Sequence, residues 1–257
     1  MKKLTFTALL ITNLLIGCGA KTQIEGNNAR TLYENTVNEL AKDDGGFPWI
    51  FNSIDYDTIE EQLKEIQIRY TYSPYATLAE LRTADLYFKR QEYEQAATEY
   101  EEFIKRHPSH NGTPYAKYFL ALSNYKLIKG YDRSPKSARQ SIEWFDNYIN
   151  SYPESPLVND ATKKVLESKE VLAEREIYIG NFYARKNNPK AAAERYKIVT
   201  EKYSDTKHLD EALYLLGKSY IELNENEQAL TALNRIINEM PDSKYNDDAR
   251  QLASTIK

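Results

Sequence analysis

Small, aromatic and aliphatic residues recur along this chain at fixed spacings. The pattern has six positions, separated by steps of 3, 9, 4, 3 and 5 residues. Side chains three or four residues apart share one face of an α-helix, so each copy predicts two amphipathic helices joined by a short turn. The complete copies are Ala84, Tyr87, Ala96, Tyr100, Phe103 and Pro108; Gly180, Tyr183, Ala192, Tyr196, Val199 and Ser204; and Gly217, Tyr220, Ala229, Leu233, Ile236 and Pro241.

Each position in this pattern has a physical role. A small residue followed by tyrosine lets the first helix lie close to its partner while the ring fills the adjacent space. The proline ends the second helix, because it lacks an N–H and clashes with the preceding turn. The pattern resembles the tetratricopeptide repeat, and its best copy runs from Leu216-Gly217 to Pro241. The period is 37 residues, for example from Gly180 to Gly217, slightly longer than is usual for that repeat.

The connectors between the predicted hairpins carry helix-start signals. Ser73-Pro74, Thr113-Pro114 and Ser155-Pro156 each offer a hydroxyl N-cap followed by proline at the first helical position. Thr206 and Ser243 stand at the equivalent places without the proline. We therefore predict an all-α fold, a superhelical array of about five tetratricopeptide-type hairpins. The expected hairpins are residues 29–70, 74–107, 114–152, 156–203 and 207–240, followed by a capping helix over 244–256 that completes a domain over 29–257.

Some hairpins depart from the repeat. In the third, the pattern begins at Ala121 but resumes eight residues late at Ser141, which predicts a loop insertion around residues 130–135. No proline stands between Leu157 and Lys186, so this stretch predicts a single helix of about thirty residues. The expected elements of the degenerate first hairpin are helices over 29–42 and 55–69, with a loop over 43–51.

The N-terminal residues have the organisation of a lipoprotein export signal. Lys2 and Lys3 make the start basic, residues 4–16 are mostly apolar but too short to span a bilayer, and Leu15-Ile16-Gly17-Cys18 resembles the bacterial lipobox. We expect a cleaved signal peptide over 1–17 and a lipidated flexible tether over 18–28, beginning with Cys18. Gly19 follows the cysteine in place of an aspartate, which favours the outer membrane. The alternative is an ordinary secretory signal that contains a cysteine by chance.

Charge and motif content exclude several classes of function. The 257 residues carry 34 basic and 38 acidic side chains, a net charge of −4 spread along the chain, which argues against nucleic-acid binding. His107 and His110 form an HxxH pair without a third ligand motif, so we expect a connector there and no metal site. The sequence contains no phosphate-binding glycine loop, zinc-protease motif or nucleophile elbow. We therefore predict a non-enzymatic protein without a cofactor.

Several stretches resemble the BamD family, lipoprotein subunits of the β-barrel assembly machinery (BAM) of the outer membrane. The resemblance covers most of the chain after the signal, and it includes the eight-residue insertion and the long fourth hairpin. It departs at the Gly-Phe-Pro-Trp loop of the first hairpin and at Ser204, where proline is usual. The similar stretches are residues 69–75, 132–135, 152–155, 160–164, 182–183, 192–196 and 203–206.

This resemblance implies a scaffold on the periplasmic face of the outer membrane, anchored through the lipid on Cys18. It implies binding to the periplasmic domains of BamA, association with other BAM lipoproteins, and engagement of unfolded β-barrel outer-membrane proteins through their C-terminal signal strand. One alternative is another periplasmic tetratricopeptide adaptor, such as the cell-division coordinator CpoB. That protein has a coiled coil ahead of its repeats, and no heptads precede Arg30 here. An unrelated lipoprotein adaptor is a further alternative.

The tetratricopeptide resemblance also singles out residues for a peptide-binding groove. In such arrays the concave face is formed by set positions of the first helix of each hairpin. Aromatic surface beside two lysines would suit a peptide that ends in an aromatic residue and a free carboxylate, as barrel signals commonly do. The alternative is that these side chains only pack against neighbouring hairpins. The candidate groove residues are Phe88, Lys89, Tyr118, Tyr125 and Lys126, and the same count adds Leu78, Leu81, Asp85, Tyr115 and Leu122.

Arg195 is the candidate contact to BamA, because the BamD-like pattern has an arginine here that pairs with an acidic residue of BamA. It stands one place before the core position Tyr196, which predicts a side chain at the edge of its helix. The planar fork of arginine suits a bidentate pair with a carboxylate. The alternative is a pair with Glu194 or Glu201, and surface pairs of that kind contribute little stability.

We predict that Cys18→Ala prevents lipid modification and leaves an uncleaved or soluble protein, because the thiol that receives the acyl chain is missing. Metabolic labelling with a tagged fatty acid, followed by membrane fractionation, measures both outcomes. Wild-type protein that carries no label at Cys18 would show that the lipoprotein interpretation is wrong.

Overall fold

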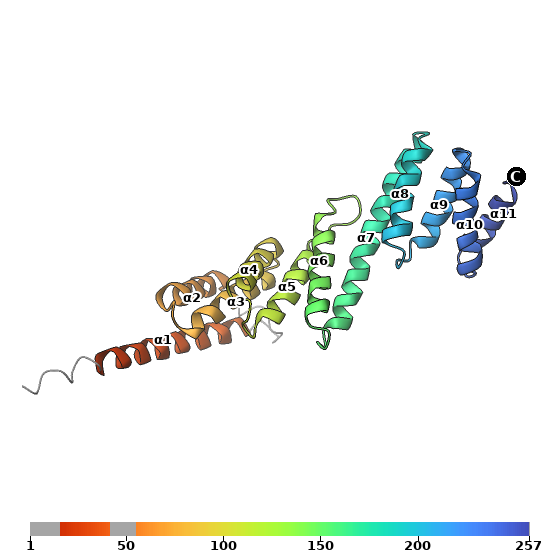
Figure 1. Ribbon diagram of the computed structural model, residues 1–257. Coiled ribbons are helices and arrows are strands. Elements are labelled where there is room, and N and C mark those ends of the chain that lie inside the picture. The colour runs from red at the N-terminus through yellow and green to blue at the C-terminus, as the bar shows by residue number, and fades with distance from the viewer. Residues whose placement is uncertain (1–15, 42–54, 257) are drawn as a thin grey trace, which may run out of the picture. The chain divides into compact units, whose positions relative to one another are not determined.

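The structure, a computed structural model, describes residues 16–41 and 55–256 and is all-α (Figure 1). Eleven helices follow one another in these described residues, with short connectors between most of them. They are α1 (Ile16–Ala41), α2 (Tyr56–Arg69), α3 (Pro74–Lys89), α4 (Tyr93–Arg106), α5 (Thr113–Lys126), α6 (Lys136–Ser151), α7 (Val158–Arg185), α8 (Pro189–Lys202), α9 (Leu209–Glu222), α10 (Asn226–Glu239) and α11 (Asn246–Ser254).

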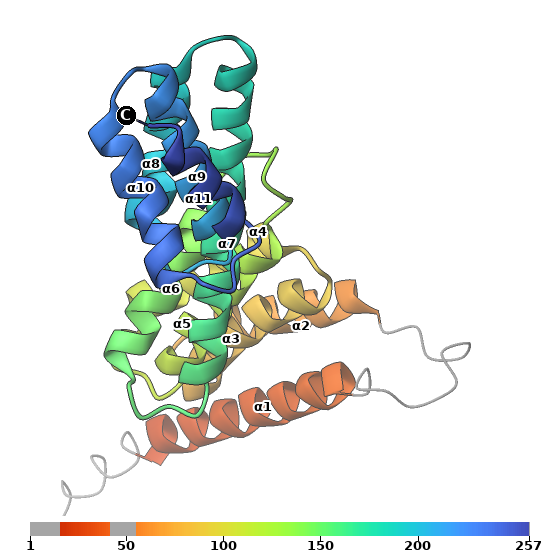
Figure 2. The ribbon, with the colours of Figure 1, turned by 90° about the vertical axis from the view of Figure 1, so that its right-hand side faces the viewer.

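The helices pack on their sequence neighbours, as successive hairpins require. The chain divides into two compact units between Ala116 and Lys117, inside α5. In the first unit, α2 packs on α1 and α3, and α4 packs on α3. In the second, each helix from α6 to α10 packs on the next, and α11 lies against α10 at the C-terminal end (Figure 2). This arrangement confirms the predicted all-α fold of helical hairpins.

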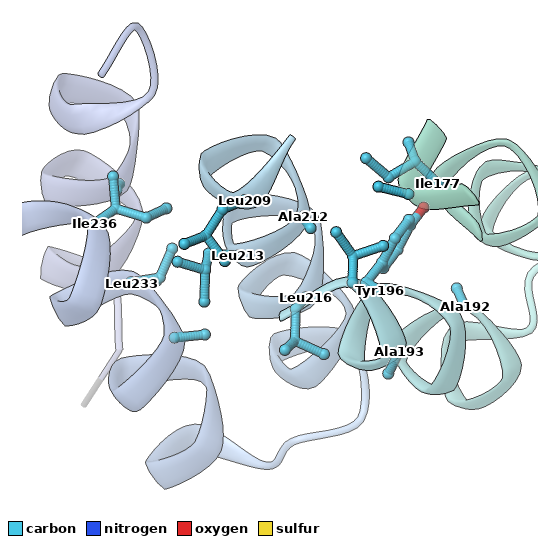
Figure 3. Close-up of a cluster of buried hydrophobic side chains, with 14 residues drawn as sticks. Ile177, Ala192, Ala193, Tyr196, Leu209, Ala212, Leu213, Leu216, Leu233 and Ile236 are labelled. Atoms are coloured by element: carbon cyan, nitrogen blue, oxygen red, sulfur yellow. The ribbon is translucent and has the colours of Figure 1, made fainter. Parts of the chain in front are cut away.

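The repeat positions form the core. Of the first complete copy, Ala96, Tyr100 and Phe103 are completely buried, as are Val199, Leu233 and Ile236 at matching positions of the later copies. Figure 3 shows the cluster in the second unit, where side chains of α7, α8, α9 and α10 meet. The spacing of these residues thus marks the buried stripe of each amphipathic helix.

Glycine at the small position allows paired helices to approach closely. A Cβ atom added to Gly180 of α7 would lie 2.4 Å from Cε1 of Tyr196 on α8. The Tyr196 hydroxyl donates a 2.7 Å hydrogen bond to Oδ1 of Asn181, the residue after that glycine. At Gly217 the added Cβ would lie 2.8 Å from the branched end of Leu233. In both hairpins, a large side chain occupies the space that the missing Cβ leaves.

The insertion and the long helix are confirmed, and they support each other. Helix α7 has 28 residues, and the inserted loop precedes α6 over residues 127–135. Arg175 Nη1 on α7 donates to the backbone carbonyl oxygens of Tyr131 (2.9 Å) and Arg133 (2.8 Å) in that loop. The rings of Tyr131 and Tyr178 lie 5.4 Å apart. Helix α7 therefore holds the inserted loop in place.

The helix-start device operates as predicted only at Ser73-Pro74, where Ser73 caps α3 and Pro74 is its first residue. At Ser155 and Ser243 the prediction of an N-cap is wrong. Each hydroxyl accepts from the backbone N–H two residues later, and the helix begins one residue after that, at Val158 or Asn246. Serine forms such local turns readily, because its hydroxyl reaches the nearby backbone.

Helix α1 begins earlier than the pattern predicts. It starts at Ile16 and includes residues 18–28, which we expected to form a flexible tether. No proline interrupts this stretch, so the backbone can continue the helix of the first hairpin. Among the described helices, none combines the length and apolar character needed to cross a bilayer. The expected loop over 43–51 and the signal residues up to 15 lie outside the described residues.

We predict that Gly180→Ala lowers the free energy of unfolding by about 1–3 kcal/mol, because the new Cβ displaces the rigid Tyr196 ring. The sign of this change is informative. Alanine forms helices better than glycine, so without the clash with Tyr196 the substitution would stabilise α7 by roughly 1 kcal/mol. Urea unfolding measures the change. Gly217→Ala is the matched comparison and should cost less, because the end of Leu233 can rotate away. Higher stability of Gly180→Ala would contradict the close approach.

Candidate functional site

The groove candidates of the first unit lie at the end of α3. The Phe88 ring meets the Tyr93 ring edge-on, with centroids 5.3 Å apart. Lys89 Nζ donates to the backbone carbonyl oxygen of Leu40 at 3.1 Å, near the end of α1. Carbonyl groups in the last turn of a helix lack hydrogen-bond partners within that helix. A cation there also interacts favourably with the negative end of the helix dipole. Both side chains are half-buried, so each has a packing role in this unit.

Asp85 is buried and forms the centre of a polar network, so its predicted place on the groove surface is wrong. Its Oδ1 accepts hydrogen bonds from the hydroxyls of Tyr100 (2.7 Å) and Tyr115 (3.0 Å). Its Oδ2 pairs with Arg82 Nη1 at 2.6 Å. Burial, together with the adjacent carboxylate, raises the pKa of both tyrosines above the ordinary value. A buried carboxylate needs such partners to offset its lost hydration.

The groove candidates of the second unit lie on α5. Tyr118 is buried, its ring meets those of Phe145 and Tyr148 edge-on, and its hydroxyl donates to Asp160 on α7. Tyr125 donates to Glu167 Oε2 at 2.6 Å. This hydrogen bond, together with burial, raises the pKa of Tyr125 to about 12. The structure therefore brings the two tyrosines together as contacts between α5 and α7.

Lys126 differs from the other groove candidates because its side chain is exposed. Phe88 and Lys89 belong to the first unit, whereas Tyr118, Tyr125 and Lys126 belong to the second. Within each unit, the aromatic candidates pack against neighbouring helices, which was the alternative to lining a peptide-binding groove. Peptide binding stays a prediction for the partly exposed Phe88 and for Lys126.

Arg195 lies on α8 and pairs with a residue that sequence reasoning missed. Its Nη1 lies 3.1 Å from Oε2 of Glu176 on α7. The Glu176 side chain is only 10% exposed, whereas that of Arg195 is 38% exposed. The expected alternative partners were wrong: Glu201 pairs with Lys197 at 3.5 Å. Glu176 is nineteen residues before Arg195, so only the packing of α7 against α8 reveals the pair.

Exposed aromatic side chains on α7 were also missed. Tyr178 is 49% and Phe182 47% exposed, although both are large and apolar. They stand four residues apart, which places them on one face of the helix. Lys186 Nζ lies 5.9 Å from the Phe182 ring centroid. The available signal was that neither residue occupies one of the six pattern positions, which form the core.

The two histidines take up roles in a connector. His107 Nε2 lies 2.9 Å from Glu80 Oε2, and His110 Nδ1 accepts from the Gly112 N–H at 3.0 Å. A search of the described residues finds no cluster of three His, Cys, Asp or Glu side chains placed to hold a metal ion. The geometry of this connector thus stabilises the turn between α4 and α5.

Comparison with known proteins identifies the family. Residues 28–232 match the family described as YfiO, outer membrane lipoprotein. The outer membrane protein assembly factor BamD of Rickettsia prowazekii is 30% identical over 250 residues, which cover 96% of this chain and 95% of the relative. The chain belongs to the BamD family. BamD of Caulobacter vibrioides is 25% identical over 230 residues (88% and 72% of the two chains), and BamD of Pasteurella multocida is 26% identical over 241 residues (89% and 88%).

Membership of the BamD family decides several predictions. The chain is a homologue of an outer membrane protein assembly factor, and it belongs to a family of outer-membrane lipoproteins. The predicted family and the outer-membrane location are therefore confirmed. Because BamD relatives are assembly factors, the prediction of a non-enzymatic protein is confirmed as well.

Proposed function

We propose that this chain is a periplasmic scaffold of the β-barrel assembly machinery that binds the periplasmic domains of a BamA homologue and unfolded outer-membrane proteins. The observation that carries the proposal is the match to a BamD assembly factor over nearly the full length of both chains. A lipid on Cys18 would hold the scaffold at the membrane, where other BAM lipoproteins join it. Rigid helical hairpins suit this task, because they present side chains at fixed places without a catalytic centre.

Arg195 is our candidate for the contact to the BamA homologue. Its side chain is 38% exposed, on a helix that packs along α7. An arginine has five N–H donors in a planar fork, and the pair with Glu176 uses a bond from Nη1. The fork therefore keeps donors for a carboxylate of a partner. Such a pair, central in an interface and shielded from water, contributes far more than an exposed surface pair.

We predict that Arg195→Gln weakens binding to the purified periplasmic domains of the BamA homologue by about 1–3 kcal/mol. Glutamine is preferable to glutamate, because Arg195→Glu would add a second carboxylate beside buried Glu176 and so disturb the fold. Calorimetry with the full chain in detergent measures the affinity. Arg235→Gln is the control, since Arg235 is similarly exposed at 36% and pairs with Glu239 at 3.2 Å. Wild-type affinity of folded Arg195→Gln would place the interface elsewhere.

A client peptide is the second proposed partner, with its terminal aromatic ring on aromatic surface and its carboxylate near a lysine. Phe88 in the first unit, which is partly exposed, is one candidate anchor. Lys126 in the second unit, which extends into solvent at the end of α5, is a separate candidate. Lys89 is less suitable for a test, because removing it would also leave the Leu40 carbonyl group without this donor.

We predict that Lys126→Ala weakens binding of a peptide with a C-terminal phenylalanine carboxylate by about 1–3 kcal/mol. Fluorescence anisotropy with a labelled peptide measures this change, and an amidated peptide should bind the wild type more weakly. Lys129→Ala is the control, because this lysine is also exposed and lies just beyond α5. Unchanged affinity in the folded Lys126→Ala variant would rule out this lysine as the anchor of the carboxylate.

A further inference from the structure

Glu176 is a buried carboxylate on α7, one turn before Gly180. Its neighbours Leu172, Ala173 and Ile177 are buried apolar residues of the same helix. A buried charge is costly unless it is paired, and an apolar side chain of similar size would often be at least as stable. Packing alone therefore does not account for glutamate at this position. What the glutamate adds is the ion pair with Arg195.

The backbone around this pair is held rigidly. Tyr196, next to Arg195, is 1% exposed, and its ring occupies the space above Gly180, one turn after Glu176. Its hydroxyl donates to Asn181. These contacts fix the rotation and the axial position of α8 relative to α7. The Arg195 side chain thus projects from α8 at a fixed position. The Glu176 carboxylate then sets the direction in which its guanidinium points.

Arginine has several rotatable bonds, and about 2 kcal/mol of rotamer entropy opposes its ordering in a new contact. A side chain that is already ordered in the free protein avoids part of this cost on binding. Glu176 contacts one edge of the guanidinium through Nη1, while more than a third of the Arg195 side chain faces solvent. The planar group can therefore keep its buried partner and accept a second carboxylate.

We propose that Glu176 is a positioning residue, which orients the Arg195 guanidinium for the carboxylate of a partner protein. This inference rests on the proposed contact of Arg195 with the BamA homologue. It gives this segment of α7 a second role, because the adjacent Arg175 also holds the inserted loop.

The test is a double-variant cycle on the full-length chain, with the purified periplasmic domains of the BamA homologue as the probe. Glu176→Gln keeps the volume and removes the charge, and it should weaken binding roughly two- to tenfold, the factor expected when one long side chain loses its ordering. In the Arg195→Gln background, the same change should have no further effect. Glu176→Met should weaken binding equally without lower stability, because the half-exposed guanidinium can turn to water.

Glu170→Gln is the matched control, because Glu170 also lies on α7 and pairs at 3.0 Å with Lys207, in the connector between α8 and α9. It should bind like the wild type. Equal losses for Glu176→Gln in both backgrounds would assign Glu176 to the fold alone and overturn the inference. Unchanged or tighter binding of Glu176→Gln, with weak binding of Arg195→Gln, would overturn it while the Arg195 contact stands. Wild-type binding of Arg195→Gln would instead overturn the contact itself.

Discussion

The structure depends on one recurrent contact, in which a small residue on one helix faces a large side chain on the next. Gly180 opposite Tyr196 and Gly217 opposite Leu233 leave no room for an added Cβ. This contact sets the distance between paired helices and fixes how each is rotated about its axis. If a helix were rotated about its axis by one residue position, a different side chain would face the interface. The contact therefore also sets the direction in which each functional side chain of these hairpins points.

Tyrosine serves this architecture better than phenylalanine, and the chain has 21 tyrosines against 8 phenylalanines. The ring fills the space between helices, while the hydroxyl reaches a carboxylate on a neighbouring element, as with Tyr100 and Asp85 or Tyr125 and Glu167. Such bonds satisfy buried polar atoms, and they keep the phenol protonated by raising its pKa. Tyr100 is completely buried in this way, whereas Tyr125 stays half-buried.

The departures from the repeat gather on α7. Helix α7 holds the inserted loop through Arg175, exposes Tyr178 and Phe182, and places Glu176 beside Arg195. Rigid helical hairpins present such side chains at fixed places. The family match covers this region.

The sequence by itself determined the helices, their order, the insertion and the long α7, because spacings of three and four residues and helix breakers act locally. It also pointed to the BamD family. Only the tertiary structure decided that Asp85 and Tyr118 lie inside their units and that Lys89 reaches the end of α1. It likewise decided that Arg195 pairs with Glu176, nineteen residues away, and Tyr118 with Asp160, forty-two residues away. The physical reason is that such partners depend on how whole helices are rotated and placed against each other, which no local spacing specifies.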